Sequence, residues 1–410
     1  MLPGEARRWR LVEDAVTTVL LTHAYEEIHL PLLEYTELFA RGVGESTDIV
    51  EKEMYNLVDR DGDGLSLRPE GTAGCVRALQ ENGLLFNQTQ RVFYRGSMFR
   101  YERPQLGRYR QFYQVGAEAF GFAGPDVDAE LIHMCAQFWH ALDVASAVRL
   151  EINTLGTPEA RGAHRQALVD FLTPHEAELD EDSQRRLKTN PLRILDSKVE
   201  KTRDILTDAP VMQSYLDDES KAHFDELQER LTVLGVNFVV NEHLVRGLDY
   251  YNHTVFEWIT DELGSQGTVC GGGRYDGLVE QLGGRPTPAA GFGMGIERLI
   301  LLHEAVHQSN FEDRACDAYV CFANPEVEAY AWEFGKALRE RGVGVRMHMG
   351  GGAFKKQLKR ADGSGAVAAV IIGEQEMQEK KVTIKVLGSG DQNTVSWEQA
   401  VTDVMAAVQD

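Results

Sequence analysis

The sequence predicts an α+β protein built around an antiparallel sheet flanked by helices, with a helical insertion and a C-terminal α/β domain. Three observations support this fold class. Aromatic and β-branched runs flank a short loop near residue 100, strand signals stop near residue 156 and return near 236, and strands alternate with helices after residue 315. A chain of 410 residues exceeds one typical core, so several domains are expected.

Residues 1–156 are expected to form the first part of the sheet. Helical periodicity over about residues 5–24 leads into "YEEIHLPLLEY", whose proline and aliphatic residues indicate a strand at a sheet edge. The runs "EMYNLVDR" and "LSLRPEG" flank the turn signal "DGDG" and predict a β-hairpin. Two longer strands are predicted at "RVFYRGSMFR" and "YRQFYQVGAEAFG", followed by a helix at "DVDAELIHMCAQFWHAL".

The rest of the chain changes character twice. Residues 157–235 carry charged amphipathic patterns and few strand signals, which indicates a helical insertion. Residues 236–312 bring back strand and glycine signals, as expected if the first sheet is completed after an interruption. Residues 316–410 alternate strand and helix patterns and predict a separate domain with a mixed sheet.

The composition excludes several classes of protein. A net charge of -22 and a pI near 5.0 argue against a protein that coats nucleic acid or anionic membranes through its overall field. No apolar run is long enough to span a membrane, and the N-terminal stretch has the pattern of an amphipathic helix rather than a signal peptide. The five scattered cysteines form no CxxC motif, which favours reduced thiols that fill space in a cytoplasmic protein.

Arginines concentrate between residues 91 and 121, where lysine is absent and the acids are two glutamates. Arginine without lysine favours planar, bidentate recognition of phosphate or carboxylate. With Glu102 as the single neighbouring acid, the arginines of "MFRYERPQLGRYRQF" are expected to lack partners within the chain. Arg246 in "LVRGLDYY" and Arg298 in "GFGMGIERL" lie in similar contexts. A salt bridge explains any one of them, but together they predict a polyphosphate ligand.

Two metal-binding patterns lack the structural context that they require. The calcium-loop pattern at Asp59, Asp61, Asp63, Gly64 and Glu70 is flanked by strand signals, whereas such a loop needs helices on both sides. The zinc-protease pattern "HEAVH" has no recognisable third ligand downstream. We therefore expect no tightly bound metal.

These segments resemble the class II aminoacyl-tRNA synthetases. The stretch from "RVFYRG" to "GAEAFG" is similar to their motif 2, "GFGMGIERL" to motif 3, and "YEEIHLPLLEY" to motif 1 with its proline at Pro31. "LVRGLDYYNHTVFEW" and "GSQGTVCGGGRYDGL" resemble the two peptides peculiar to the histidyl-tRNA synthetase family. The resemblance covers essentially the whole chain. That family usually carries a short segment with arginine and glycine before "LPGE", whereas this sequence starts at Met1, a departure at the N-terminal edge of the expected dimer.

The resemblance implies the class II antiparallel sheet, with the C-terminal domain binding the anticodon. It also implies histidine–tRNA ligase activity: ATP and L-histidine form histidyl-adenylate and pyrophosphate, and histidine then passes to the 3′ end of tRNA(His). Mg²⁺ would accompany ATP, and a homodimer is expected. The alternative is a non-catalytic paralogue that regulates histidine biosynthesis by binding a phosphoribosyltransferase. Such paralogues tend to lose the histidine peptides and the C-terminal domain, and both are present here.

The resemblance also implies roles for individual residues. Arg100 would hold the α-phosphate of ATP and Arg298 the γ-phosphate, with Glu102 in the same ATP site. Arg246, at the histidine carboxylate, would be catalytic together with Arg100. The ammonium group would bind Glu70, Thr72 and Gln114, and the imidazole ring Glu118 and Tyr251. The complete expected histidine site is Glu70, Thr72, Arg100, Gln114, Glu118, Arg246, Tyr250, Tyr251 and Tyr275.

Transfer RNA is expected to contact two basic regions. Arg103 and Gln105, in the motif 2 loop, are candidates for the acceptor end. Lys355, Lys356 and Lys359, which fall mostly on one helical face together with Arg360, are candidates for the anticodon side, although a solvated surface also explains them. Contacts to phosphate position a nucleic acid without reading its sequence.

Overall fold

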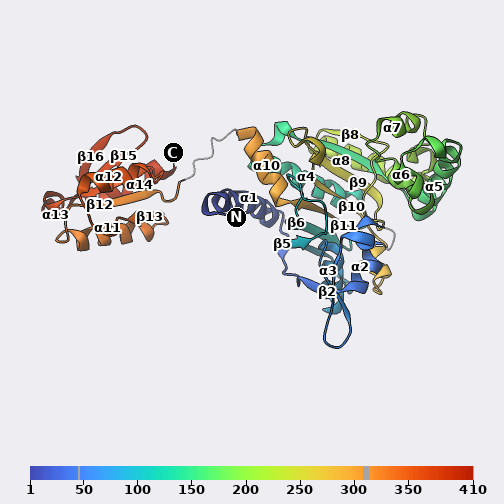
Figure 1. Ribbon diagram of the computed structural model, residues 1–410, viewed down its shortest axis with the longest axis horizontal. Helices are drawn as coiled ribbons and strands as arrows, with labels where there is room; N and C mark the ends of the chain where they lie inside the picture. The colour runs from blue at the N-terminus through green and yellow to red at the C-terminus, as the bar shows by residue number, and fades with distance from the viewer. Residues whose placement is uncertain (45–46, 308–313, 410) are drawn as a thin grey trace. The chain divides into compact units, whose positions relative to one another are not determined.

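The computed structural model describes residues 1–44, 47–307 and 314–409. The chain divides into two compact units, one within Trp9–Gln308 and the other consisting mainly of Ser309–Asp410 (Figure 1). Within the described residues, no helix has the length and apolar character needed to cross a membrane.

The main sheet of the larger unit has the strand order β1-β5-β6-β11-β10-β9-β7-β8. Its pairings are antiparallel except β1 with β5 and β7 with β8. Strand β6 pairs with β5 on one side and with β11 on the other, so segments far apart in sequence complete one sheet, as predicted. The strands are β1 Glu26–Glu27, β5 Gln90–Phe99, β6 Gln111–Phe120, β7 Arg149–Thr154, β8 Phe238–Val240, β9 Asn252–Ile259, β10 Thr268–Arg274 and β11 Ala289–Gly295.

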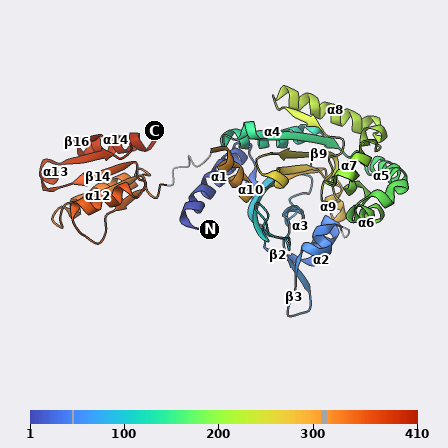
Figure 2. The same ribbon diagram turned by 45° about the horizontal axis from the view of Figure 1, so that its top comes forward.

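Helices cover both faces of the main sheet. One face packs against α1 (Pro3–Thr22), α4 (Pro125–Ala141), α8 (Asp218–Val233) and α10 (Ile296–His307). The other face carries α3 (Thr72–Glu81) and α9 (Leu278–Gln281), with α2 (Thr36–Val43) packed against them. In Figure 2, α4 and α8 lie on one side of the sheet and α2 and α3 on the other.

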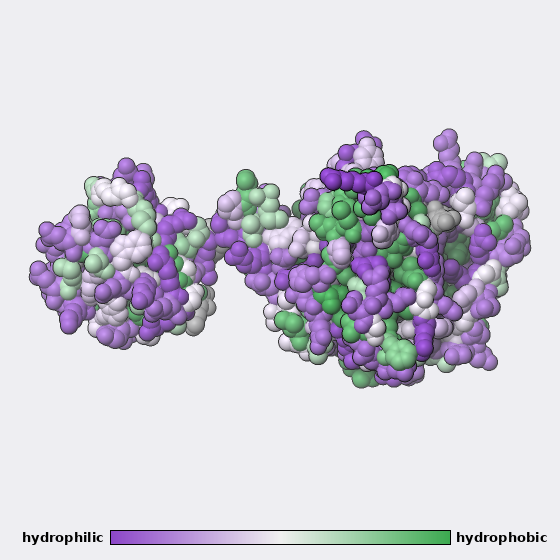
Figure 3. Space-filling view, turned by 90° about the horizontal axis from the view of Figure 1, so that it is seen from below, coloured by the Kyte–Doolittle hydropathy of each residue, from purple (hydrophilic) through white to green (hydrophobic). Residues whose placement is uncertain are grey.

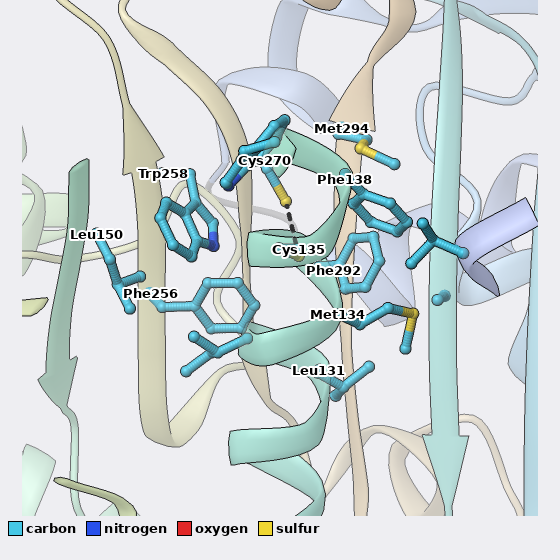
Figure 4. Packing of buried hydrophobic residues seen from close by; sticks show 14 of the residues in the cluster. Leu131, Met134, Cys135, Phe138, Leu150, Phe256, Trp258, Cys270, Phe292 and Met294 are labelled. Carbon is cyan, nitrogen blue, oxygen red and sulfur yellow. Dashed lines mark hydrogen bonds between the residues drawn. The ribbon is translucent and has the colours of Figure 1, made fainter. Parts of the chain in front are cut away.

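The core beneath α4 is closely packed and contains two of the cysteines. Cys135 on α4 points to Cys270 on β10 with 3.7 Å between the sulfurs, amid aromatic side chains of β9, β11 and α4 (Figure 4). Trp139 and Trp258 meet edge to face with ring centroids 5.7 Å apart. All five cysteines are buried free thiols, which agrees with the space-filling role predicted for them.

Arg274, at the end of β10, is the centre of an ion-pair network in which every donor of its guanidinium has a partner. The Arg274 guanidinium donates from Nη2 and Nε to Asp128 (2.6 and 3.3 Å) and from Nη1 to Asp276 (3.1 Å). The carbonyls of Phe122 and Gly124 accept its remaining two hydrogens. A buried guanidinium is tolerated when all five donors are satisfied. Because Arg274 ends β10, this network fixes the backbone that carries the next residue, Tyr275.

The predicted hairpin is confirmed, but the predicted edge strand before it is wrong in one respect. A small sheet has the order β2-β4-β3, with β2 at Leu33–Tyr35, β3 at Tyr55–Val58 and β4 at Gly64–Leu67. The segment "YEEIHLPLLEY" contributes β1 to the main sheet and β2 to this small sheet, rather than one strand. Proline has no amide hydrogen for a ladder, and Arg68 Nη1 instead donates to the Leu30 carbonyl at 2.8 Å.

Residues 158–233 fold into helices and helical turns. Each of α5, α6 and α8 begins at a polar residue whose side-chain oxygen accepts an amide hydrogen of the first turn: Thr157, Asp180 and Asp217. Helix α8 packs against α4 and adds Phe224, Leu227 and Leu231 to the main core. The elements are α5 Pro158–Leu172, η3 Thr173–Glu178, α6 Glu181–Thr189, η4 Pro191–Ile194, α7 Glu200–Leu206, η5 Met212–Tyr215 and α8; further helical turns are η1 Ile49–Glu53, η2 Ala145–Ala147 and η6 Gly264–Gln266.

The smaller unit has the predicted mixed sheet, with the order β13-β12-β14-β15-β16. Strands β13, β12 and β14 are parallel, and β15 and β16 continue the sheet in antiparallel fashion. Helix α12 buries Gln357 and Ala361, whereas its lysines are exposed. The elements are β12 Ala318–Phe322, α11 Glu328–Arg339, β13 Val345–Met347, α12 Phe354–Asp362, β14 Ala368–Ile372, α13 Glu374–Glu379, β15 Lys381–Val386, β16 Gln392–Ser396 and α14 Trp397–Gln409.

Candidate active site

A cavity of about 340 Å³ opens over the middle of the main sheet, between β6, β10 and β11, the segment before β9, and the start of α10. It gathers residues from the segments that resemble motifs 2 and 3, from "RPEGT" and from both histidine peptides. The predicted residues that line it are Glu70, Thr72, Arg100, Glu102, Gln114, Arg246, Tyr250, Tyr251 and Arg298. Glu118 and Tyr275 lie behind its wall and reach it through hydrogen bonds.

Arg298 is a half-buried cation whose partners are all neutral. Its guanidinium donates to the carbonyls of Gly107 (3.1 Å) and Thr268 (2.6 Å) and to Gln266 Oε1 (3.0 Å). Burial lowers the pKa of Arg298, and the nearby Arg108 lowers it further. Within the described residues no carboxylate forms an ion pair with it. A cation held in this way favours an anionic ligand.

Arg100 shows the same pattern at the end of β5. Its Nε donates to the carbonyl of Pro69 at 2.8 Å, and its guanidinium lies 5.2 Å from the centroid of the Phe112 ring. In the part of the chain that the structure describes, it too has no carboxylate partner. Arg100 and Arg298 therefore bring to one cavity two positive charges that form no ion pair with a carboxylate of the described residues.

Arg246 differs because it does have an internal partner. Its Nη1 forms an ion pair with Glu257 on β9, and its guanidinium lies 5.7 Å from the centroid of the Tyr251 ring. Burial opposes the charge, but Glu257 and Tyr251 together raise the pKa of Arg246 above its ordinary value. The absence of a side chain at Gly271 makes room for the guanidinium, since a Cβ there would lie 2.5 Å from Nη1. Arg246 therefore forms a salt bridge within the chain and also lines the cavity.

The expectation that the loop arginines lack internal partners is wrong for Arg108 and Arg110. Arg108 forms an ion pair with Glu102, which holds that carboxylate at the cavity wall. Arg110 donates to the Glu102 carbonyl at 3.2 Å and stacks over the Tyr101 ring, 4.1 Å from its centroid. The loop folds back on itself, with reciprocal backbone hydrogen bonds of 3.0 Å between Gln105 and Arg108.

Arg103 and Gln105 are exposed and do not line the cavity. Lys355, Lys356 and Lys359 are exposed on α12 of the smaller unit. Their roles toward tRNA stay predictions.

Glu118 is the most deeply buried acid near the cavity, with 1% of its surface exposed. Its Oε1 accepts from Thr72 Oγ1 (2.8 Å) and from the Tyr94 hydroxyl (2.9 Å), and its Oε2 accepts from the Tyr275 hydroxyl. Burial raises the pKa of Glu118 to about 8, although these hydroxyls work in the opposite direction. A carboxyl group that is protonated more easily in this way, and that hydroxyls hold in place, can donate as well as accept a hydrogen bond.

The glycines of "GFGMG" make room for the polar side chains of the neighbouring strand. A Cβ at Gly291 would lie 1.7 Å from Glu118 Oε2, and a Cβ at Gly293 would lie 2.4 Å from Gln114 Nε2. Gln114 Oε1 is buried without a hydrogen-bond partner among the described residues. A buried unsatisfied acceptor in a cavity is a natural partner for a ligand donor.

Glu70 is neither a surface acid nor part of a calcium loop. It is buried, and its carboxylate accepts from the amides of Thr72 (2.6 Å) and Ala73 (3.0 Å) at the start of α3. Burial raises its pKa. Asp59 instead accepts the amides of Asp61 and Asp63 and closes the hairpin turn, as a strand–turn–strand context requires. No group of three or more potential metal ligands occurs among the described residues.

Three tyrosines cluster at the cavity, with Tyr250 and Tyr251 in its wall and Tyr275 behind them. The rings of Tyr250 and Tyr251 have centroids 4.7 Å apart, and Tyr275 meets Tyr250 edge to face at 5.4 Å. All three are buried. Such a cluster gives an apolar wall that also carries hydroxyl groups.

Several lining residues escaped the sequence prediction. Tyr94, Glu257 and Glu297 lie on elements that were predicted, but their side chains gave no separate signal. Arg193 and Asp196 come from the helical insertion, whose sequence has the pattern of a charged surface. The one available signal for Arg193 was its place between leucine and isoleucine directly after Pro191.

The buried Glu118 carboxyl predicts a pH dependence of stability. Its folded pKa of about 8 exceeds the ordinary 4.5, so the folded chain binds more protons than the unfolded chain between these values. Stability should therefore fall as pH rises through this window. Glu118→Gln removes the titration, and its free energy of unfolding relative to the parent should rise by a few kcal/mol from pH 5 to pH 9, on the order of 1.4 kcal/mol per pKa unit.

Urea unfolding at the two pH values measures this difference. Glu229→Gln, at an exposed position on α8, is the matched control and should show no such change. An equal response of the two variants would contradict the assignment of the effect to Glu118.

Comparisons with known proteins show the family to which the chain belongs. The family described as "Histidyl-tRNA synthetase" matches residues 1–299, and an "Anticodon binding domain" family matches residues 317–406. The crystal structure of apo histidyl-tRNA synthetase from S. aureus is 33% identical with a TM-score of 0.77, over 98% of this chain and 97% of that one.

More distant structures share the fold. A histidyl-tRNA synthetase from a Nostoc species is 19% identical with a TM-score of 0.76, over 99% of this chain and 97% of that one. A Bacillus halodurans protein is described as an ATP phosphoribosyltransferase regulatory subunit/histidyl-tRNA synthetase. It is 22% identical with a TM-score of 0.62, over 90% of this chain and 94% of that one. The family matches, the S. aureus relative and the class II type of sheet together establish that the chain belongs to the histidyl-tRNA synthetase family.

Proposed function

We propose that the chain is a histidine–tRNA ligase that activates L-histidine with ATP and then esterifies tRNA(His). The observation that carries this proposal is the pairing of two features in one cavity. Arg100 and Arg298 supply positive charges without carboxylate partners among the described residues, and the tyrosine-lined end next to Glu118 supplies a polar pocket for a ring. A polyphosphate and an imidazole would be held side by side.

In the first step, an oxygen of the histidine carboxylate attacks the α-phosphorus of ATP. The new oxygen–phosphorus bond forms as the bond to the β-phosphate oxygen breaks, and pyrophosphate leaves. Two anions must approach each other, so cations at the reacting atoms lower the barrier. Arg246 would neutralise the carboxylate and the α-phosphate, Arg100 would hold the α-phosphate and Arg298 the γ-phosphate. Glu102 would contribute to the ATP site, and magnesium would arrive with ATP as part of the substrate.

Recognition of histidine would use the buried polar groups. Gln114 Oε1 has no hydrogen-bond partner among the described residues and suits the ammonium group. Glu70 and Thr72 lie on the same side, and Glu70 keeps free lone pairs beyond the two amides it accepts. Glu118 and Tyr251, with Tyr250 and Tyr275, would read the ring. Substrates without ring nitrogens would leave these buried groups unsatisfied, which favours rejection.

In the second step, a hydroxyl of the terminal tRNA ribose attacks the acyl carbon of the adenylate, and AMP leaves. Arg103 and Gln105, on the exposed loop beside the cavity, would contact the acceptor end. Lys355, Lys356 and Lys359 would contact the anticodon side. Contacts of this kind weaken as salt concentration rises.

Histidine-dependent exchange of labelled pyrophosphate into ATP, in the presence of magnesium, tests the proposal. We expect exchange that requires histidine and is not supported by the other amino acids. A folded sample without exchange would contradict the ligase assignment and favour the regulatory paralogue, whose test is binding to a phosphoribosyltransferase. The complete set of cavity residues and the matched anticodon domain support the ligase.

We further propose that the functional form is a homodimer joined through the small sheet. Apolar side chains of this sheet are exposed: Leu33 46%, Tyr35 59%, Leu57 49% and Val58 75%. Figure 3, which views the side from which the hairpin projects, shows apolar surface among polar surface on the larger unit. Leu33, Tyr35 and Leu57 lie on one face of this sheet, because Tyr35 and Leu57 both pair with Leu65 and Leu33 lies two residues before Tyr35. Exposed apolar side chains gathered on one face favour an interface.

Leu57→Asp should shift the protein toward monomer in sedimentation velocity, because a charge would be buried at the interface, on the face that also carries Tyr35. The control is Val233→Asp on α8, where the valine is 87% exposed and lies away from the small sheet. A dimer that survives the first change, or that dissociates equally in both variants, argues against this interface.

A further inference from the structure

Arg193 is a cation of the helical insertion that reaches the candidate active site. It lies in the turn η4, between buried Pro191 and Ile194, which anchor the turn in the protein. Its side chain lines the active-site cavity and also an adjoining cavity of about 200 Å³. Arg100 lines both cavities as well, so the two arginines stand at the border between them.

Arg193 lies close to Gly247, in the histidine peptide "LVRGLDYYNHTVFEW". A Cβ at Gly247 would lie 3.6 Å from Arg193 Nη1, which places the guanidinium beside the backbone next to Arg246. Arg193 therefore adds a further positive charge to the cavity that already holds Arg100, Arg246 and Arg298.

The charge of Arg193 is not matched by an ion pair among the described residues. Neighbouring cations of the adjoining cavity have acidic partners: Arg108 pairs with Glu102, Arg186 with Asp48 at 3.5 Å, and Arg185 with Asp182 at 2.9 Å. In the same part of the chain, no side chain or carbonyl accepts a hydrogen bond from the Arg193 guanidinium. Burial lowers its pKa, and Asp196, which also lines the cavity, acts in the opposite direction.

We propose that Arg193 binds a phosphate group in the reaction, so that the helical insertion contributes directly to the active site. This inference rests on the proposed function. A guanidinium offers planar, bidentate hydrogen bonding that matches phosphate oxygens. Several cations in one cavity wall repel one another, and a bound anion would offset that repulsion. The phosphate can come from two sources, the outer phosphates of ATP or the terminal phosphodiester of the tRNA.

The test compares Arg193→Ala with the parent in two assays on the full-length protein. Pyrophosphate exchange involves ATP without tRNA, whereas aminoacylation from preformed adenylate involves the tRNA end. Loss of one charge-assisted contact corresponds to about 10- to 100-fold. If the ATP phosphates are bound, the KM for ATP in exchange rises by that factor. If the tRNA phosphate is bound, exchange is unchanged and kcat/KM for tRNA in the transfer step falls by that factor. Either result supports the inference.

Controls separate this role from a structural one. Arg203→Ala removes an exposed arginine of the same insertion, on α7, and should leave both assays unchanged. Arg193→Lys keeps the positive charge and most of the bulk but loses the bidentate geometry. The kinetic constant that changes in Arg193→Ala should therefore change in this variant too, by several-fold. It also carries the test if the alanine variant melts at a lower temperature.

Unchanged kinetics in both assays for Arg193→Ala would overturn the inference, as would an equal loss in Arg203→Ala. Both outcomes leave exchange by the parent protein intact. Failure of the proposed function is distinct, because it would abolish exchange in the parent itself.

Discussion

Arg246→Ala is expected to reduce histidine-dependent pyrophosphate exchange by about 100- to 1,000-fold, the effect of removing one preorganised charge at a reacting centre. The guanidinium lines the cavity, is held in place by Glu257, and lies over the Tyr251 ring. In the proposed reaction, its removal should leave the carboxylate of histidine and the α-phosphate without the cation that neutralises their charges. The loss should be greater in kcat than in the KM for ATP, because the charge acts mainly in the transition state.

A companion variant tells catalysis from structure. Arg246→Ala leaves the Glu257 carboxylate, 17% exposed, without its cation, so part of any loss could come from reduced stability. Arg246→Ala combined with Glu257→Gln removes that carboxylate's charge, and the amide oxygen of the introduced side chain can still accept from Thr268. Thermal unfolding of the double variant should return toward the parent while exchange stays low. Recovery of exchange in the double variant would show that Arg246 acts only as the partner of Glu257.

Asp128→Ala is expected to destabilise the larger unit by about 3–5 kcal/mol, the usual effect of removing one partner from a buried ion pair. Arg274 and Asp128 are each 1% exposed as side chains, so water cannot replace the lost carboxylate. Asp128 also accepts from Thr254 Oγ1 at 2.6 Å and contacts His223 Nε2 at 3.0 Å. The substitution therefore orphans several groups in one step. Urea unfolding followed by circular dichroism measures the loss.

The exposed pair Arg185–Asp182 provides the matched control. Its side chains are 51% and 61% exposed, and solvent screens such pairs, so Asp182→Ala should change stability little. Comparable losses for Asp128→Ala and Asp182→Ala would contradict the buried network as a stabilising element.

The long strands, the hairpin and the C-terminal alternation could be predicted because their signals are local. Aromatic and β-branched runs, "DGDG" and the regular periodicity each lie within about ten residues. The split of "YEEIHLPLLEY" could not be predicted in this way. The two halves pair with different strands that come later in the sequence, Glu26–Glu27 with β5 and Leu33–Tyr35 with β4.

The candidate site divides along the same line. Arginine without lysine, next to glycine-rich strands, was enough to predict a phosphate ligand. Arg100 and Arg298 line one cavity, and the ligand itself stays a prediction. The partners of Arg108 and Arg110 were missed because a loop that folds back onto Glu102 and Tyr101 leaves no periodic pattern. The hydrogen-bonded environment of Glu118 could not be predicted either, because the three hydroxyls that donate to its carboxyl come from separate parts of the chain.

The order of strands in the main sheet has a consequence for synthesis on the ribosome. Strand β6 ends at Phe120, but its second neighbour begins at Ala289, and the 168 residues between them take roughly 8 to 34 s to translate at about 5–20 residues per second. During that interval one edge of β6 has no ladder partner, and such an edge can pair with another nascent chain. The yield of correctly folded protein should therefore depend on translation speed and on the crowding of ribosomes along the message, even between variants whose finished folds are equally stable.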